Sequence, residues 1–265
     1  MRDVILPDSA ARLNFFPRPP SAGLSPWVQC HWRLERSPGF AGSEKLYPDA
    51  GASLTITLDP LNPTITLCAN RHTLFETWDT PARKLGVRFR PAGAHALLGL
   101  SPSRFTDTHY LLDDSERSPP WQASLSRVAE RLYRLTPDEG LALLDAWLCQ
   151  RLTTLTAPSR TPQLVEALSR LSCSPLEAGA RLGLSRRTLE RRLEREAGVS
   201  PGQLMAFARL HYARRALIGS RQPLAQIALI CGYHDQAHFS HAFKRFALEA
   251  PGAYRQRKLS QIYKA

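Results

Sequence analysis

Residues 179–201 read GARLGLSRRTLERRLEREAGVSP, and residues 228–251 read ALICGYHDQAHFSHAFKRFALEAP. Residues 193–204 and residues 243–254, which overlap the ends of these stretches, share one spacing. A large apolar residue is followed by arginine two positions later, proline eight later and glycine nine later. Two copies of one pattern, about fifty residues apart, indicate a repeated structural unit. Apolar residues at helical spacing run through both copies, so each unit is expected to be helical.

A glycine in each copy predicts a sharp turn between two helices. Gly183 follows Gly179 by four residues, and Gly232 follows Ala228 by four. Glycine accepts the left-handed backbone that often ends a helix, and the small residue one turn earlier lets the next helix cross closely. Ser185 is suited to cap the helix that follows the first turn. Each copy is therefore predicted to be a helix-turn-helix unit, with Gly183, Ser185 and Gly232 at the turns.

The second helix of each unit has one apolar stripe and otherwise polar faces. Leu189 and Leu193 form the stripe in residues 186–196, and Phe239 and Phe243 form it in the second unit. An apolar stripe should face the domain core and leave the polar faces free. The polar residues are Arg186, Arg187, Glu190, Arg191, Arg192 and Arg195 in the first helix, and Gln236, His238, Ser240, His241, Lys244 and Arg245 in the second.

Positive charge is concentrated in the same part of the chain. Residues 159–265 contain 18 Lys and Arg against 7 Asp and Glu, a net charge of +11, whereas residues 1–158 contain 17 against 16, a net charge of +1. Such asymmetry indicates a polyanion as the partner of the C-terminal part. Together with two helix-turn-helix patterns joined by a further helix over residues 203–218, it predicts binding to double-stranded DNA.

Side-chain chemistry divides the polar residues into two groups of candidates. Arginine can contact guanine with two hydrogen bonds, glutamate can accept from cytosine, and glutamine can pair with adenine. The candidates for base contacts are Arg187, Glu190, Arg191, Gln236, Ser240 and His241. The candidates for phosphate contacts, which would set the register on DNA, are Arg186, Arg192, Arg195, His238, Lys244 and Arg245. For Arg187 a phosphate role stays equally open.

The N-terminal part is predicted to be rich in β-structure. Alternating or β-branched residues mark strands over residues 28–35, 53–58, 64–68 and 84–90. Helical spacing predicts a short helix over residues 94–100 and longer ones over 121–135 and 137–152. Residues 156–162, TAPSRTP, have the composition of a linker.

The expected fold class is α+β, with a β-rich, barrel-like N-terminal domain and trailing helices ahead of an all-α domain. We divide the chain into a β-rich effector or dimerisation domain (1–120), a helical connection and linker (121–157) and a DNA-binding domain (158–265). The apolar stripes of the connecting helices, which include Leu144 and Trp147, are candidates for a dimer or inter-domain contact.

Other classes of function find little support in the residues. No apolar run reaches the roughly 20 residues of a membrane span, and the first residues lack the pattern of a secretory signal. The five cysteines form no C-x-x-C pair, so neither a zinc site nor a disulfide framework is predicted. His234, His238 and His241 lie near one helix face, but no carboxylate or cysteine at suitable spacing completes a metal site. No catalytic motif stands out, and no cofactor is predicted.

The C-terminal part resembles the AraC/XylS family of bacterial transcription regulators. The resemblance covers about residues 162–257 and rests on Gly183–Arg191 (GLSRRTLER), Gly198–Pro201 (GVSP), Gly232–Gln236 (GYHDQ) and Phe239–Arg245 (FSHAFKR). It implies an all-helical domain in which a central helix presents two recognition helices to successive major grooves. The second unit departs from the family at Ala237, His241, Ala247 and Leu248. Leu248 stands where glycine is usual, so the first unit is expected to be the main base reader.

A weaker resemblance links the N-terminal part to a β-rich domain found ahead of this module in some regulators. It rests on Tyr47–Asp49 (YPD) and Gly86–Pro91 (GVRFRP). Glycine usually follows the aspartate, where this chain has Ala50. Ligand sensing or dimerisation is the role that such a domain usually has in the family.

The sequence thus predicts a sequence-specific transcription regulator, a promoter-proximal activator controlled through its N-terminal domain. Expected partners are double-stranded DNA, RNA polymerase, a small-molecule effector and a second copy of the chain, at the nucleoid in the cytoplasm and not at a membrane. Two alternatives stay open. One is a metal-dependent enzyme in the β domain, although His31, His72, His95 and His109 are scattered along the chain. The other is an architectural protein that binds DNA without sequence preference.

Overall fold

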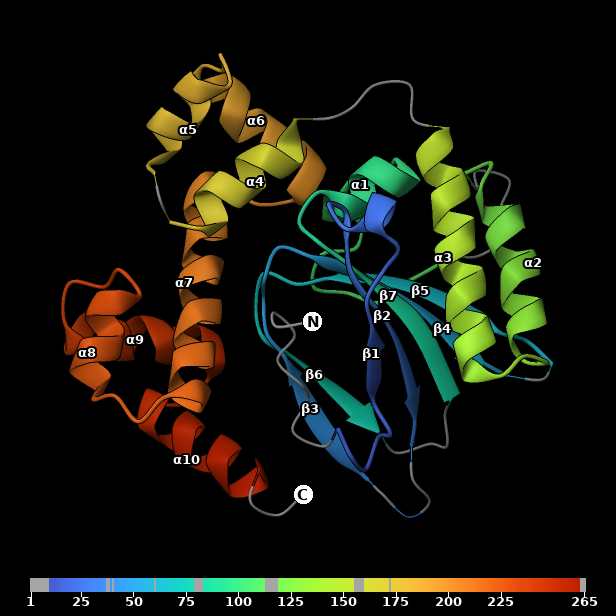
Figure 1. Cartoon of the computed structure of the whole chain (residues 1–265), viewed down its shortest axis with the longest axis horizontal. Coiled ribbons are helices and arrows are strands. Elements are labelled where there is room, and N and C mark those ends of the chain that lie inside the picture. Colours follow the sequence, from blue (N-terminus) through green and yellow to red (C-terminus); the bar gives the residue numbers. More distant parts are fainter. Residues whose placement is uncertain are drawn as a thin grey trace.

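A computed structural model of the chain describes residues 10–36, 39, 41–59, 61–78, 83–112, 119–154, 160–171 and 173–262. Its fold class is the expected one: a β-rich N-terminal part with trailing helices, then a helical part with two helix-turn-helix units (Figure 1). The expected domain boundary at residue 157 lies outside the described residues, as does most of the linker expected over 156–162. None of the described helices is both long and apolar enough to cross a membrane.

The N-terminal part contains two antiparallel sheets. The larger has six strands in the order β1-β2-β7-β4-β5-β8, and the smaller pairs β3 with β6. The strands are β1 (Phe16–Arg18), β2 (Val28–Glu35), β3 (Gly42–Leu46), β4 (Ala52–Leu58), β5 (Thr64–Ala69), β6 (Leu74–Trp78), β7 (Arg83–Phe89) and β8 (Tyr110–Leu111). Short helical segments are η1 (Ala22–Leu24), α1 (Gly93–Leu98) and η2 (Pro102–Arg104). The four strands expected from alternation are confirmed as β2, β4, β5 and β7.

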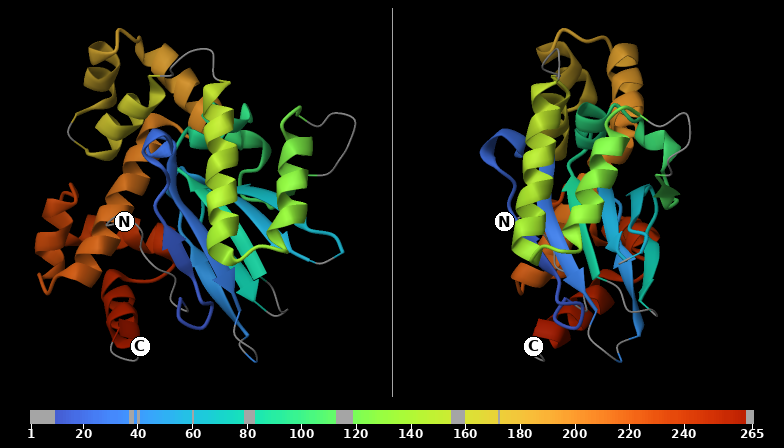
Figure 2. Two further views of the ribbon diagram at one scale, coloured as in Figure 1. Left: turned by 45° about the vertical axis from the view of Figure 1, so that its right-hand side comes forward. Right: turned by 90° about the vertical axis from the view of Figure 1, so that its right-hand side faces the viewer.

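Alternation gives the larger sheet two different faces. In β4, Leu54 and Ile56 are fully buried in the main core, whereas Ser53 and Thr55 are half-buried on the opposite face. Helices α2 (Gln122–Leu132) and α3 (Pro137–Thr153) cover the apolar face (Figure 2). The polar face is left to form the wall of a cavity.

The apolar stripes of α2 and α3 lie in the core of the N-terminal part. Leu125, Leu144, Trp147 and Leu148 all pack in the same buried cluster as the sheet. Burial of these side chains within one chain leaves them no free surface. The expectation that this stripe makes a dimer or inter-domain contact is therefore wrong for these residues.

The described residues of the C-terminal part form seven helices. They are α4 (Thr161–Ser169), α5 (Pro175–Arg181), α6 (Arg186–Ala197), α7 (Pro201–Gly219), α8 (Leu224–Ile230), α9 (Gln236–Ala247) and α10 (Pro251–Ile262). Two buried clusters hold them together. Leu204 and Phe207 of α7 belong to the cluster around α4–α6, and Leu210 and Leu217 belong to the cluster around α8–α10. The long helix α7 thus joins the two units through both cores.

The helical part packs against the β-rich part. Ala50 and Ala92 are buried in the cluster of the first unit, and Tyr47 packs against the cluster of the second. Figures 1 and 2 place the sheets between α2 and α3 on one side and the C-terminal helices on the other. Contacts of the N-terminal part therefore reach both helix-turn-helix units.

Candidate nucleic-acid interface and effector cavity

The first unit has the close helix crossing that its sequence predicts. Gly183 adopts a left-handed backbone, with φ of 66°. A Cβ added to Gly179 would lie 2.9 Å from the Leu184 carbonyl oxygen and 3.3 Å from Leu189 Cδ1. Only a residue without a side chain fits there, because real Cβ contacts are almost never so short. Ser185 begins α6, and its Oγ accepts a hydrogen bond of 3.2 Å from the amide of Thr188.

Helix α6 presents most of its polar residues to solvent. Leu189 and Leu193 are buried, as expected for the core stripe. The predicted contact residues Arg186, Arg187, Glu190, Arg191 and Arg195 are exposed, and Arg192 is half-buried. The exposed face therefore contains all the base candidates of this helix.

Two ion pairs order parts of this face. Arg186 Nε lies 2.9 Å from Glu190 Oε1, one helical turn away. Arg195 Nη2 lies 2.6 Å from Glu196 Oε1, and the Thr161 hydroxyl donates to the same carboxylate. Burial would raise the pKa of Glu196, but these hydrogen bonds and the Arg195 charge outweigh it and lower that pKa. Arg187 and Arg191 have no such pair among the described residues, so their guanidinium groups are available to a ligand.

The second unit repeats this construction with a different cap. Gly232 is left-handed, with φ of 77°, and the buried Ala228 replaces the glycine of the first unit. Asp235 begins α9, and its Oδ1 accepts a hydrogen bond of 2.7 Å from the amide of His238. That bond is the main cause of a lowered pKa of the Asp235 carboxyl. The cap of this helix was not foreseen, although aspartate ahead of a helix is a recognisable signal.

Helix α9 turns its polar residues outward as well. Phe239 and Phe243 are fully buried. The predicted contact residues Gln236, His238, His241, Lys244 and Arg245 are exposed, and Ser240 is half-buried. The histidines do not converge: His234 Nδ1 lies 3.2 Å from Asp235 Oδ2, and the His238 ring packs 5.4 Å from that of Tyr233. In the described part of the chain, no three His, Cys, Asp or Glu side chains form a metal-binding group.

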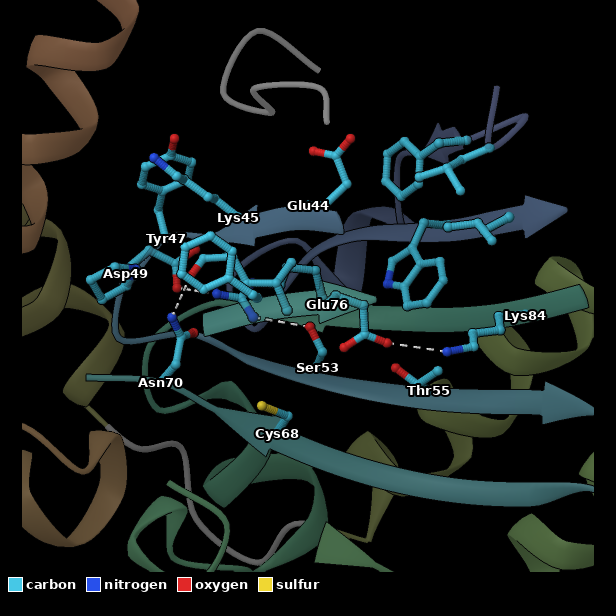
Figure 3. A pocket seen from close by; sticks show the side chains of 18 of the residues that line it. Glu44, Lys45, Tyr47, Asp49, Ser53, Thr55, Cys68, Asn70, Glu76 and Lys84 are labelled. Carbon is cyan, nitrogen blue, oxygen red and sulfur yellow. Dashed lines mark hydrogen bonds and ion pairs between the residues drawn. The ribbon is translucent and has the colours of Figure 1, made fainter. Parts of the chain in front are cut away.

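A second candidate site is a cavity of about 620 Å³ between the two sheets and the C-terminal helices. Its floor is the polar face of the larger sheet, with Ser53, Thr55 and Cys68 pointing into it (Figure 3). Aromatic side chains of Trp32 and Phe75 also line it. The volume lies within the range of about 300–1,000 Å³ that is typical of small-molecule sites.

Helices α7 and α10 close one side of this cavity. They contribute Leu210, His211, Arg214 and Lys258. The Arg214 guanidinium carbon lies 3.6 Å from the centre of the Tyr47 ring, a cation–π contact across the two parts of the chain. Burial lowers the pKa of Lys258 to about 8. A molecule in this cavity would touch both the β-rich part and the helix that joins the two helix-turn-helix units.

Ionisable groups on the cavity wall are paired with each other. Glu76 Oε1 lies 3.2 Å from Lys84 Nζ, and Glu76 Oε2 lies 3.2 Å from His109 Nε2. Burial would raise the pKa of Glu76, but hydrogen bonds and charges from His109 and Lys84 lower it overall. The hydrogen bond with Glu76 is the main cause of a raised pKa of His109. Burial raises the pKa of Cys68 to about 11, so its thiol is neutral.

The two N-terminal motifs noted in the sequence meet at the edge of the cavity. Arg88 donates hydrogen bonds to the Asp49 carboxylate and to the Ser53 hydroxyl. Ala50 has a left-handed backbone, with φ of 60°, which is the conformation that glycine adopts most easily. The preference for glycine after the aspartate thus has a backbone cause. The rest of the cavity, including Arg214 and Lys258, was not predicted, because its walls come from distant segments.

Comparison with known protein families also divides the chain into an N-terminal and a C-terminal part. Residues 179–257 match the family described as "Helix-turn-helix domain", and residues 17–110 match one described as "Domain of unknown function (DUF6597)". The first match contains both turns and both recognition helices. The second contains most of the strands that form the cavity.

Similar proteins are transcription activators by name. RhaS, the HTH-type transcriptional activator of Yersinia pestis (strain Pestoides F), is 37% identical over 75 residues, 28% of this chain and 28% of RhaS. RhaS of Klebsiella pneumoniae (strain 342) is 39% identical over 69 residues, 26% of this chain and 25% of RhaS. This chain thus spans only about a quarter of the length of these relatives.

A solved structure resembles more of the chain at lower identity. ToxT from Vibrio cholerae O395 aligns with 82% of this chain and 97% of its own, with 15% identity and a TM-score of 0.41.

Proposed function

We propose that this chain, whose C-terminal helices form a DNA-binding domain of the AraC/XylS family, is a transcription regulator that binds a specific sequence in double-stranded DNA. One observation carries this proposal. Helices α6 and α9 each begin with a side-chain cap, bury one apolar stripe and expose a polar face, and α7 joins them through both cores. Two such helices on one module can enter two segments of major groove.

Within this function we assign base reading to Arg187, Glu190, Arg191, Gln236, Ser240 and His241. We assign phosphate contacts to Arg186, Arg192, Arg195, His238, Lys244 and Arg245. The exposure of both sets on α6 and α9 supports the assignment, with Arg192 and Ser240 less accessible than the others. Arg186 engages Glu190 Oε1, which leaves Glu190 Oε2 to accept a hydrogen bond from cytosine.

Selection from a random duplex library tests the proposal. The full-length chain should enrich one sequence motif, and that motif should span two major-groove segments. Recovery of all sequences alike would instead support the architectural alternative. Turnover of a substrate that depends on residues of the β domain would support an enzyme.

We further propose that a small molecule in the cavity controls this activity. The lining combines hydroxyl groups with aromatic rings, which suits an organic molecule with an apolar or aromatic body and several hydrogen-bonding groups. A panel of such compounds should contain one that raises the melting temperature of the protein by several degrees. The variant Thr55→Trp fills the floor of the cavity, so it should keep its fold and lose that response.

The remaining partners follow from the same proposal. A promoter-proximal activator acts on chromosomal DNA in the cytoplasm and contacts RNA polymerase. A second copy of the chain would place two sets of recognition helices on one operator. Sedimentation of the purified chain with and without operator DNA measures how many copies bind.

A further inference from the structure

We infer that the β5–β6 turn, residues 70–73, is a positioning element that holds the C-terminal ends of both recognition helices and so sets the distance and angle between them. The inference assigns a part in DNA reading to residues of the N-terminal domain. It rests on the proposed function only for its DNA readout. Figure 1 places β6 on the side of the β-rich part that faces the C-terminal helices.

The turn holds the end of α6 through Arg71. Its Nε donates a hydrogen bond of 2.8 Å to the Gly198 carbonyl oxygen, and its Nη2 lies 2.7 Å from Glu194 Oε1. The last carbonyl groups of a helix lack partners within the helix and carry partial negative charge. The Arg71 guanidinium group donates a hydrogen bond to such a carbonyl group, and its positive charge compensates the partial negative charge. Ser101 of the same domain donates a further bond of 3.0 Å to the Arg195 carbonyl oxygen.

The same turn holds the end of α9 through Thr73. Its Oγ1 donates a hydrogen bond of 2.5 Å to the Phe246 carbonyl oxygen. Lys45, on the neighbouring strand β3, donates a hydrogen bond of 3.0 Å to the Ala247 carbonyl oxygen, and its Nζ lies 2.9 Å from Glu249 Oε1. One short segment and its strand partner therefore contact the ends of both recognition helices.

These contacts fall at the matching helix ends of the internal repeat: on the Gly198 carbonyl in the first copy, and on the carbonyls two and one residues before Leu248 in the second. Gly198 and Leu248 occupy the same position in the two copies, and both are left-handed, with φ of 71° and 57°. A leucine in this conformation is strained relative to glycine.

The turn is itself fixed to the sheet. The backbone amide of Arg71 donates a hydrogen bond of 2.9 Å to Asp107 Oδ1, and His72 Nδ1 lies 3.2 Å from Asp107 Oδ2. Asn70 Nδ2 donates to the His72 carbonyl oxygen at 2.7 Å and to that of Leu46 at 2.9 Å. Asn70 also lines the cavity. A rigid turn at the cavity edge can transmit a change in the cavity to both helices.

Distance measurements in the full-length chain test the inference without DNA. Spin labels at Ala180→Cys and Ala237→Cys, both exposed, report the separation of the two units, with Cys149→Ser removing the more accessible native thiol. The chain with the wild-type turn should give one narrow distribution of distances between the two labels. The double variant Arg71→Ala/Thr73→Val should broaden it or add a second distance.

Two further variants make this result decisive. Arg170→Ala removes an arginine whose ion pair of 2.5 Å with Glu166 lies at the C-terminal end of α4, so the distribution should stay narrow. Thr73→Val alone is nearly isosteric, and it replaces the double variant if that protein does not fold. An unchanged distribution in the folded turn variants overturns the inference.

Operator spacing provides the functional readout. Two base pairs inserted between the segments read by α6 and α9 should weaken binding of the wild-type chain, because the two helices are held at one separation. In the turn variant, the ratio of affinities for the original and the lengthened operator should fall by about fivefold or more, which is within the usual range of coupling between sites. Equal spacing dependence in both proteins contradicts the inference. Failure of the wild type to bind any DNA overturns the proposed function instead. The distance measurement would still show whether the turn fixes the separation of the two units.

Discussion

Single side chains on α6 differ in how they can meet DNA. Leu189 and Leu193 are buried, so the direction opposite them faces solvent and is the proposed reading face. Arg191 is exposed and unpaired among the described residues, whereas the neighbouring Arg192 is half-buried. Successive residues of a helix are rotated by about 100°. Arg191 and Arg192 therefore cannot both point to the floor of one groove.

A matched pair of substitutions separates these roles. Arg191→Ala should weaken binding to the selected operator by about 1–3 kcal/mol and relax preference at one or two base pairs. Arg192→Ala should weaken binding to specific and scrambled DNA alike. It should also reduce the slope of log affinity against log salt concentration by about one. Titrations of both variants on both DNAs measure the difference. If Arg191→Ala lowers both affinities by one factor, that arginine contacts phosphate.

A buried histidine gives the N-terminal part a pH dependence. His31 is fully buried, and its Nε2 lies 2.7 Å from Asp145 Oδ1 of α3. Burial lowers the pKa of His31 below 6.5 in the folded chain, although Asp145 opposes the shift. Between the lowered folded pKa and 6.5 the unfolded chain binds more protons, so the free energy of unfolding falls as pH falls through that window.

The variant His31→Gln should therefore lose part of this acid sensitivity. Melting temperatures of the wild type and the variant, measured from pH 7.5 to 5.5, should converge as the pH falls. A constant difference across this range would show that His31 is not the titrating group. Groups that do not contact His31 titrate equally in both proteins, so the comparison removes their effect.

Elements with a strong pattern were predicted from the sequence, and those without one were missed. Strand β4 alternates cleanly between apolar and polar residues, and its ends were predicted to within one residue. Strands β3 (GSEKL) and β6 (LFETW) carry charged side chains and pair only with each other, so alternation is weak. The turns of both helix-turn-helix units were predicted because a left-handed residue and a close crossing restrict the choice of side chain.

Helix ends provide the next test, because the two units end differently. Leu248 is left-handed and half exposed, so Leu248→Gly removes strain and few contacts. It should stabilise the chain by about 1 kcal/mol. Gly183→Ala, at φ of 66° with open space around the added Cβ, should destabilise it by a similar amount. Denaturant unfolding measures both changes, and destabilisation by Leu248→Gly would mean that its side-chain contacts outweigh the backbone strain.

The arrangement of the whole molecule was the least predictable level. Contacts between Lys45 and Glu249, or between Arg71 and Gly198, join segments more than a hundred residues apart. Lys45, Arg71 and Glu249 look like ordinary surface residues in their own segments, so no local pattern marks these contacts. The polar residues that α6 and α9 expose were predicted from the sequence, because an amphipathic pattern identifies an exposed face. The cavity was not, because its walls combine strands with α7 and α10.

The C-terminal part should behave as an independent unit. Two buried clusters lie within it and, among the residues that the structure describes, receive only Ala50, Ala92 and Tyr47 from the N-terminal part, so residues 159–265 should fold alone into helices. This fragment has a net charge of +11. It should bind duplex DNA, and five cationic phosphate candidates imply a slope of log affinity against log salt of about −4.5. Without the β5–β6 turn it should tolerate altered operator spacing better than the full-length chain. A folded fragment with no DNA affinity at low salt would contradict the proposed function, whereas tight binding with the spacing preference intact would assign the geometry to α7 alone.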